Sequence, residues 1–299
     1  MFQKRWYRKY KKYVLNGNID AARNIVIKNA GQIKLYKFCS GRRHHLENLF
    51  SCKFYLSNAK KFNDPFDSLS LANVRSKSEY DRLDSREREL AHKEYLEQVE
   101  SNNIAYEFQS NVFVTCFSEI GVDNLHMWSY YADEHKGFCI EYSLKQMLDA
   151  GIDILPIVYV DDWEADRTIP DYNIQVALIK GNDWAQEREW RIVSVDPSKS
   201  KELGKVIDGI LPEAIYVGCR EQEHIDETWG EYYDLADVIK DASVLRKYVW
   251  EGTRTRISIN EIMDACENFS EVKIPLYWMS PAEGRIGLKK RTVKYLWKG

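Results

Sequence analysis

Short runs of alternating apolar, β-branched and aromatic residues recur along this 299-residue chain, and they constrain its fold more than any other feature. Runs of roughly four to eight such residues, bounded by glycine or polar residues, are typical of β-strands. The clearest runs cover residues 34–39, 53–57, 111–118, 137–143, 154–160, 189–195, 214–218, 273–279 and 292–297. The sequence therefore predicts a sheet at the centre of the fold.

Helical patterns fall between these runs, but without the regular strand–helix–strand repeat that is typical of a parallel sheet. A polar capping residue before an apolar stripe, and often a glycine after it, marks each helix. The predicted helices cover residues 18–31, 76–102, 123–132, 143–151 and 258–266, with Asp123 expected to cap the third. We expect an α+β fold in which a mixed, mainly antiparallel sheet is flanked by helices.

Charge is distributed unevenly and marks the two ends of the chain. Residues 1–30 carry eight Lys/Arg and one Asp, and residues 285–299 carry six Lys/Arg and no acid, although the whole chain has a net charge of −3. We expect a basic helical arm at 1–30, an α+β core domain at 31–250, and a C-terminal helix and strands at 251–299 packed on that core.

The basic ends have two interpretations. The aromatic residues that interleave with the N-terminal basic residues are Phe2, Trp6, Tyr7, Tyr10 and Tyr13. Cations of this kind bind phosphates, and the rings stack on bases, so the ends are candidate surfaces for a nucleic-acid or protein partner. The alternative is that both basic segments pack on the acidic body of the protein.

Composition narrows the class of protein. Hydrophobic residues make up 44% of the chain and charged residues 30%, as in soluble globular proteins. No run approaches the roughly 18 apolar residues of a membrane helix, and the basic N-terminus lacks the apolar stretch of a secretory signal. Six cysteines without a C-x-x-C pair are typical of a reducing compartment. We expect a cytoplasmic protein without membrane contact.

The stretch FYLSNAKKFNDPFDS, residues 54–68, is either a structural corner or one wall of a binding site. Phe62 and Phe66 bracket a turn at Pro65, where the proline favours an extended residue before it and Asn63 favours an Asx-turn. The two rings would fix this corner in the core. The polar residues then left for a site are Ser57, Asn63, Asp64 and Asp67.

The stretch WAQEREWRIV, residues 184–193, concentrates charge. If a strand begins before Glu187, then Glu187, Glu189 and Arg191 share one face of it. Trp190 would lie on the opposite, core-facing side. Two neighbouring carboxylates tend to raise one pKa, and the guanidinium opposes that rise. The alternative interpretation is a solvated strand face.

Cysteine and histidine residues cluster between 116 and 139 without a familiar zinc spacing, so we expect no metal there. The four residues are Cys116, His126, His135 and Cys139. A nucleophilic Cys116–His135 pair is conceivable, but no local feature supports it. The chain also has no glycine-rich phosphate loop and no G-x-S-x-G motif.

Several sequence blocks follow one another between residues 33 and 225: LYKF, FYLSNAKKFNDPFDS, VTCFS, HMWSYYADEHKGFCIEY, WAQEREWRIV and ILPEAIYVGCR. In this series the chain resembles the bacterial family catalogued as domain of unknown function 2971. Some members of that family are encoded near phage-defence genes. The resemblance therefore implies a toxin or effector in antiviral defence, for which a neutralising protein is a candidate partner.

The chain also has a more distant resemblance to ADP-ribosyltransferases. These enzymes place a basic residue on a first strand, a Ser or Tyr on a second, and a Glu, often within E-x-E, on a later strand. Lys37, Ser57 and the pair Glu187 and Glu189 occur in that order here. The resemblance implies an enzyme that uses NAD as its substrate.

The second resemblance also implies a role for each residue. Cleavage of the nicotinamide–ribose bond builds positive charge on the ribose, which a carboxylate stabilises. Glu189 would be that carboxylate, Glu187 would orient the acceptor, and Arg191 would hold both carboxylates. Lys37 would meet a phosphate or ribose, Ser57 would position the nicotinamide ribose, and Tyr36 or Phe62 would stack on a ring. The wall opposite would consist of Asn63, Asp64 and Asp67.

Two functions of other classes stay open. One is a non-catalytic nucleic-acid or partner-binding module that uses the basic ends. The other is a metal-dependent nuclease whose oxygen ligands would be Asp64, Asp67, Glu187 and Glu189.

Overall fold

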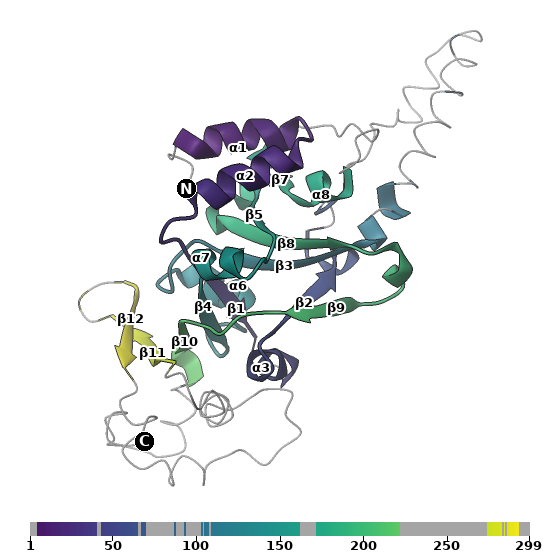
Figure 1. The fold of residues 1–299 in the computed structure, drawn as a ribbon. Coiled ribbons are helices and arrows are strands. Elements are labelled where there is room, and N and C mark those ends of the chain that lie inside the picture. The colour runs from purple at the N-terminus through teal and green to yellow at the C-terminus, as the bar shows by residue number, and fades with distance from the viewer. Residues whose placement is uncertain are drawn as a thin grey trace.

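The computed structural model describes residues 5–40, 43–64, 67–69, 109–161, 172–221, 274–282 and 286–292, with a few isolated positions between them (Figure 1). The described α-helices are α1 (Arg5–Leu15), α2 (Ile19–Asn29), α3 (Arg43–Phe50), α6 (Leu125–Tyr131), α7 (Leu144–Asp149) and α8 (Tyr172–Ala177). Short 3-10 helices are η1 (Ala59–Lys61), η2 (Asn182–Glu187), η3 (Pro197–Lys199) and η4 (Cys219–Glu221). Within these residues no helix is long and apolar enough to cross a membrane.

The strands are β1 (Lys34–Cys39), β2 (Lys53–Asn58), β3 (Val112–Ser118), β4 (Phe138–Ser143), β5 (Ile154–Pro156), β6 (Val158–Val160), β7 (Ile179–Gly181), β8 (Glu189–Val195), β9 (Gly204–Asp208), β10 (Ala214–Val217), β11 (Leu276–Pro281) and β12 (Leu288–Thr292). Ten of them form one sheet in the order β12-β11-β10-β4-β1-β3-β2-β9, with β8 pairing with β3 and β5. Among the described pairs of this sheet, β10 and β11 alone are parallel. β6 and β7 form a separate parallel pair. The prediction of an α+β fold with a mainly antiparallel sheet is confirmed.

Side-chain caps explain where several helices begin. Asn18 Oδ1 accepts a hydrogen bond from Ala21 N at 3.1 Å and caps α2, as the sequence predicts. Ser143 caps α7 in the same way, through Gln146 N. The prediction for α6 was one residue too early. Its cap is Asn124, whose Oδ1 accepts from the backbone N–H three residues further on at 3.0 Å.

Strand predictions succeed where alternation is clear and fail at short or edge strands. β1 and β8 have the predicted bounds. Residues 154–160 form two strands, β5 and β6, because Ile157 between them turns to donate its N–H to the carbonyl of Glu189 (2.9 Å). The sequence does not predict β7, β9 or α8, nor α3 or most of β12. The predicted helix at 258–266, nearly all of 76–102, and residues 293–297 lie outside the described residues.

The N-terminal segment packs on the body through two tyrosines of α1. Tyr7 and Tyr10 are buried, and their hydroxyls donate to the carbonyls of Ile157 (2.7 Å) and Pro156 (2.5 Å). Figure 1 shows α1 and α2 side by side next to β5. These two rings therefore belong to the core and are not available to stack on a partner, in agreement with the alternative interpretation that this segment packs on the body.

Strand β3 has three neighbouring strands, and this arrangement opens the sheet. β8 pairs along the whole of one edge of β3, from Val112 to Ser118. On the other edge β2 pairs at Phe113 and Val114, while β1 pairs at Ser118. β1 and β2 therefore part beside residues 115–117. This stretch of the β3 edge faces the opening rather than another strand.

Candidate functional site

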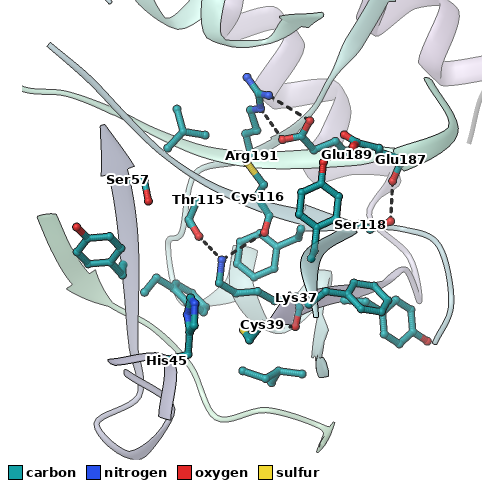
Figure 2. Close-up of a pocket in the computed structure, with 18 of the residues that line it drawn as sticks. Lys37, Cys39, His45, Ser57, Thr115, Cys116, Ser118, Glu187, Glu189 and Arg191 are labelled. Carbon is teal, nitrogen blue, oxygen red and sulfur yellow. Dashed lines mark hydrogen bonds and ion pairs between the residues drawn. The ribbon is translucent and has the colours of Figure 1, made fainter. Parts of the chain in front are cut away.

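A cavity of about 240 Å³ lies where β1 and β2 part (Figure 2). Rings of the core form its apolar side, among them Phe54, Phe117 and Tyr142. Its polar lining includes Lys37, Ser57, Thr115, Cys116, Ser118, Tyr131, Lys180, Glu187, Glu189 and Arg191. Residues from β1, β2, β3 and β8 therefore meet at one place, although they are far apart in the sequence.

Lys37 extends from β1 toward the open edge of β3. Its Nζ donates to Thr115 Oγ1 (2.6 Å) and to the Cys116 carbonyl (3.4 Å), and it lies 5.1 Å from the centre of the Phe117 ring. These contacts are all with neutral groups, and among the described residues no carboxylate forms an ion pair with Lys37. A cation held only by neutral partners inside a cavity can bind an anionic group of a ligand.

Glu187 and Glu189 both line the cavity, but they do not lie on one strand as predicted. Residues 182–187 form η2 rather than a strand, and Arg188 adopts a left-handed conformation (φ 44°) before β8 begins at Glu189. Glu189 and Arg191 share one face of β8, as predicted. Trp190 is fully buried on the other face, which confirms its predicted place in the core.

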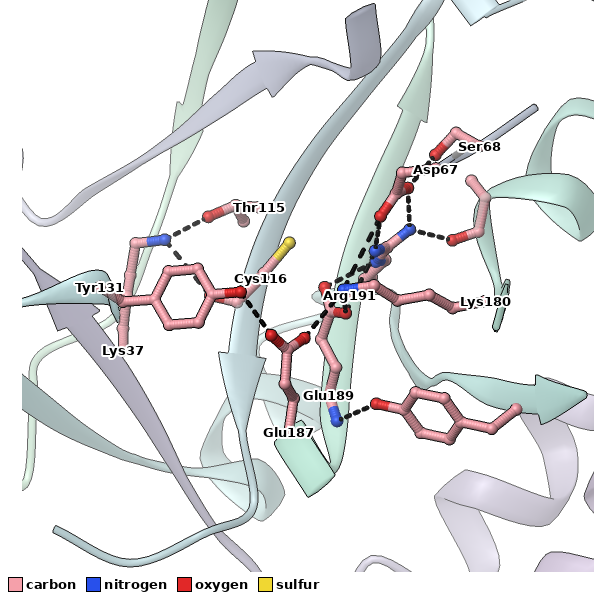
Figure 3. A network of polar contacts seen from close by, with 12 residues as sticks. Lys37, Asp67, Ser68, Thr115, Cys116, Tyr131, Lys180, Glu187, Glu189 and Arg191 are labelled. Atoms are coloured by element: carbon pink, nitrogen blue, oxygen red, sulfur yellow. Dashed lines mark hydrogen bonds and ion pairs between the residues drawn. The ribbon is translucent and has the colours of Figure 1, made fainter. Parts of the chain in front are cut away.

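Arg191 holds two carboxylates, and neither is Glu187 (Figure 3). Its Nη1 and Nη2 donate to Asp67 Oδ1 (2.7 Å) and Oδ2 (2.5 Å). Its Nε and Nη2 donate to Glu189 Oε1 (2.7 Å) and Oε2 (3.1 Å). The guanidinium is 1% exposed, so the predicted solvated strand face is wrong. Asp67 pairs directly with Arg191 and does not form a wall opposite Glu189.

Lys180 on β7 is a site residue that the sequence analysis missed. Its Nζ lies 2.8 Å from Glu187 Oε2, 3.2 Å from Glu189 Oε2 and 3.9 Å from Asp67 Oδ2. A lysine inside the apolar run QVALIKG was the signal, because a buried lysine requires a carboxylate partner. We call Asp67, Lys180, Glu187, Glu189 and Arg191 the polar cluster.

The cations of the polar cluster keep Glu189 ionised. Burial alone would raise the pKa of Glu189, but the charges of Arg191 and Lys180 outweigh burial and lower the pKa to about 2. Burial would likewise lower the pKa of Lys180, yet Glu189 and Glu187 raise it. With three carboxylates and two cations, the cluster retains one net negative charge.

Tyr131 on α6 connects a further element to the polar cluster. Its hydroxyl donates to Glu187 Oε1. Burial, and then the negative charge of Glu187, raise the pKa of Tyr131 well above its usual range. Ser118 donates its hydroxyl to the backbone carbonyl of Glu187 (2.6 Å). Glu187 is thus fixed by Tyr131 and Ser118 in addition to Lys180.

Of the other site residues predicted from the sequence, four line the cavity and Asp64 does not. Tyr36, Ser57, Phe62 and Asn63 all line the cavity. The ring of Phe62 lies 5.6 Å from the guanidinium carbon of Arg191. Asp64 is buried outside the lining, and its carbonyl accepts from the N–H of Asp67 (3.1 Å). Pro65 and Phe66 lie outside the described residues.

The cysteine and histidine residues between 116 and 139 do not form a nucleophilic pair. Burial, and then the charge of Glu189, raise the pKa of Cys116 well above its usual range, so the thiol stays protonated. His135 Nε2 lies 3.0 Å from Ser129 Oγ instead.

The structure does not favour the proposed nuclease ligands. The carboxylates of Asp67 and Glu189 accept hydrogen bonds from Arg191, and the carboxylate of Glu187 accepts hydrogen bonds from Lys180 and Tyr131. These carboxylate oxygens already have cationic or hydroxyl partners. Within the described ranges no group of three or more His, Cys, Asp or Glu residues is arranged to hold a metal ion.

Comparison with known proteins gives one match. Residues 127–192 match the family model described as "Protein of unknown function (DUF2971)". The match confirms the resemblance to that family over this segment, which includes Tyr131, Lys180 and Glu189. Lys37 lies outside it. Searches of the curated proteins and of the solved structures found no significant match.

Proposed function

We propose that this protein is an NAD-cleaving enzyme that resembles ADP-ribosyltransferases. One observation carries the proposal. Lys37, Ser57 and Glu189 come from three different strands, in the order expected for such enzymes, and all line one cavity (Figure 2). The three residues are separated by up to 152 positions in the sequence, so their convergence depends on the way that β1 and β2 part beside β3.

The charges around the cavity suit a ligand with a cationic part and an anionic part. The polar cluster retains one negative charge, while Lys37 offers a positive charge with neutral partners. NAD has a cationic nicotinamide ring and an anionic pyrophosphate. The fit supports NAD more than a ligand of uniform charge, because such a ligand would be repelled by one of the two groups.

Glu189 is suited to electrostatic stabilisation rather than to proton transfer. NAD supplies a nicotinamide–ribose bond whose cleavage leaves positive charge on the ribose. Since the pKa of Glu189 is about 2, its carboxylate is ionised at neutral pH and is a poor general acid or base. A charge that is already in place stabilises developing positive charge without reorganisation. Arg191 and Lys180 hold that carboxylate in one orientation.

Glu187 is suited to orienting the acceptor. It lies beside Glu189 but is held by a different set of donors, Tyr131 and Lys180. Lys37 would bind the pyrophosphate or a ribose, and Ser57 would bind the ribose next to nicotinamide. The role as a toxin or effector in antiviral defence, with a neutralising partner, is supported by the family resemblance alone.

Nicotinamide release and NAD-dependent thermal melts test the proposal. We expect the wild type to release nicotinamide and to melt at a higher temperature with NAD. Lys37→Met should weaken NAD binding by about 10- to 100-fold, since a hydrogen bond to a charged group contributes roughly 1.5–3 kcal/mol. Ser57→Ala should weaken it by about fivefold.

Lys34→Met is the matched control for Lys37→Met. Lys34 is on the same strand, its side chain is 55% exposed, and it does not line the cavity. NAD binding should be unchanged in this variant. A wild-type protein that neither binds nor cleaves NAD would end the proposal.

A further inference from the structure

The outward face of α1 carries a row of four cations. Arg5, Arg8, Lys9 and Lys12 are all exposed, and their spacing places them on one side of a helix with 3.6 residues per turn. Tyr10 and the other buried residues of α1 lie on the opposite side. We call these four residues the basic row.

The basic row is not neutralised by the rest of the described chain. None of its four members forms an ion pair among the described residues. The neighbouring helix α2 is different. Its half-buried Arg23 pairs with Asp20 (2.9 Å) and Asp153 (2.8 Å). Arg23 thus has carboxylate partners, whereas the four cations of the basic row have none among the described residues.

Helix stability accounts for only part of the basic row. Arg5 and Arg8 lie in the first turns of α1, and the helix has no acidic residue there. Cations at a helix N-terminus oppose the helix dipole and cost roughly 0.3–1 kcal/mol each. Arg5 is therefore at the unfavourable end of α1, whereas Lys12 lies in the last turn, where a cation is favourable.

We propose that the basic row binds the phosphodiester backbone of a nucleic acid. The row extends over seven residue steps, or about 10 Å of helix. Phosphates of one DNA strand recur every ~3.4 Å along the axis, so several lie within reach of such a row. An anionic membrane fits less well. The apolar face of α1 is already buried against Ile157 and Pro156, so it is not free to enter lipid.

The contacts of α1 fix the basic row relative to the candidate site. Lys11 Nζ donates to the carbonyl of Tyr159 (2.8 Å), and the hydroxyl of Tyr159 accepts from the backbone N–H of Glu189 (2.9 Å). A nucleic acid on α1 is therefore held by the same segment that supports β8. The binding surface itself does not depend on the reaction catalysed in the cavity.

Fluorescence anisotropy with a labelled DNA duplex of mixed sequence and with a single-stranded RNA tests the proposal. The variant is the triple substitution Arg8→Gln, Lys9→Gln and Lys12→Gln. It should weaken binding and flatten the slope of log affinity against log salt by about 2–3 units, since each lost phosphate contact releases one fewer counterion. Substitution is preferable to deletion of residues 1–13, because deletion would also remove Tyr7 and Tyr10 from the core.

The control variant carries the same change in charge elsewhere. Lys60, Lys61 and Lys201 are exposed and also have no ion pair among the described residues. Their triple substitution to Gln should leave the salt slope and affinity near the wild-type values. Circular dichroism and thermal melts should show both triple variants folded.

Three results would overturn the proposal. The first would be a wild type that does not bind either oligonucleotide at moderate salt. The second would be an equal loss of affinity in the two triple variants, because binding would then follow net charge rather than the basic row. The third would be a wild type that binds phosphatidylserine vesicles through the basic row and does not bind the oligonucleotides.

Discussion

Two buried glutamates on this sheet, Glu141 and Glu189, have different surroundings. Glu141 on β4 is 3% exposed. It accepts a hydrogen bond from Tyr216 (2.6 Å) and pairs with Lys34, whose side chain is 55% exposed. Glu189 on β8 is 5% exposed and is held by Arg191 and Lys180, which are themselves buried. Both carboxylates have partners, so burial does not distinguish them.

The difference lies in what surrounds each carboxylate. Glu141 is held by the hydroxyl of Tyr216 and by Lys34, whose side chain is largely exposed. Glu189 belongs to the polar cluster, in which carboxylates outnumber cations, and it lines the same cavity as Lys37. Glu141 does not line that cavity. A carboxylate held by buried cations, close to a lysine that has no carboxylate partner among the described residues, has the charge distribution of a binding site.

The largest expected effect is on the free energy of unfolding when the cation that pairs with each glutamate is removed. Arg191→Met would leave Asp67 and Glu189 buried without their main partner, and it should lower the free energy of unfolding by about 3–5 kcal/mol. Lys34→Met should cost about 1 kcal/mol or less, because Lys34 is largely exposed and Glu141 keeps its tyrosine donor. Urea unfolding at pH 7 measures both.

Equal destabilisation by the two substitutions would contradict the distinction between these surroundings. If Arg191→Met fails to fold, Arg191→Lys provides a second variant. It keeps one charge but loses the bidentate contacts with Asp67, and it should be destabilised less than the methionine variant.

A smaller effect is expected in acid. Folding lowers the pKa of Glu189 from its ordinary value of 4.5 to about 2, so the ionised carboxylate stabilises the fold at pH values above 4.5. That contribution, roughly 3 kcal/mol, should be lost as the pH falls from about 4.5 toward 2. In Glu189→Gln the titrating group is absent, so its stability should fall less over this range.

The measurement is the urea midpoint of wild type and Glu189→Gln at several pH values from 6 down to about 2.5. Their difference should shrink as the pH is lowered. Parallel curves would show that Glu189 does not titrate between these values, and the account of its surroundings would then be wrong.

The fold was largely predictable from local pattern, and the site was only partly so. The alternation in residues 34–39 and 189–195 determines which side chains face the core, and Trp190 follows directly. β9 was missed because an edge strand is half-exposed and has weak alternation. The left-handed conformation of Arg188 has no sequence signal, so the bend that brings Glu187 into place was not predictable.

The partners within the polar cluster were least predictable. Asp67 and Arg191 are 124 positions apart, and Lys180 comes from a three-residue strand. Contacts at such separations depend on how β2, β3 and β8 pair, which a single sequence does not encode locally. Most of the site residues named from the sequence nevertheless line the cavity or lie next to it. Charged residues inside apolar runs are buried on folding and require partners, which brings them together.

The central claim is that the charge of Glu189 stabilises positive charge in the cavity. Nicotinamide release from NAD by wild type, Glu189→Gln and the matched control Glu141→Gln tests it most directly. We predict that Glu189→Gln lowers the rate by about 10²–10³-fold, the usual cost of losing one pre-placed electrostatic group, while Glu141→Gln, if folded, retains the wild-type rate. A Glu189→Gln variant as active as the wild type, or an equal loss in folded Glu141→Gln, would contradict the claim.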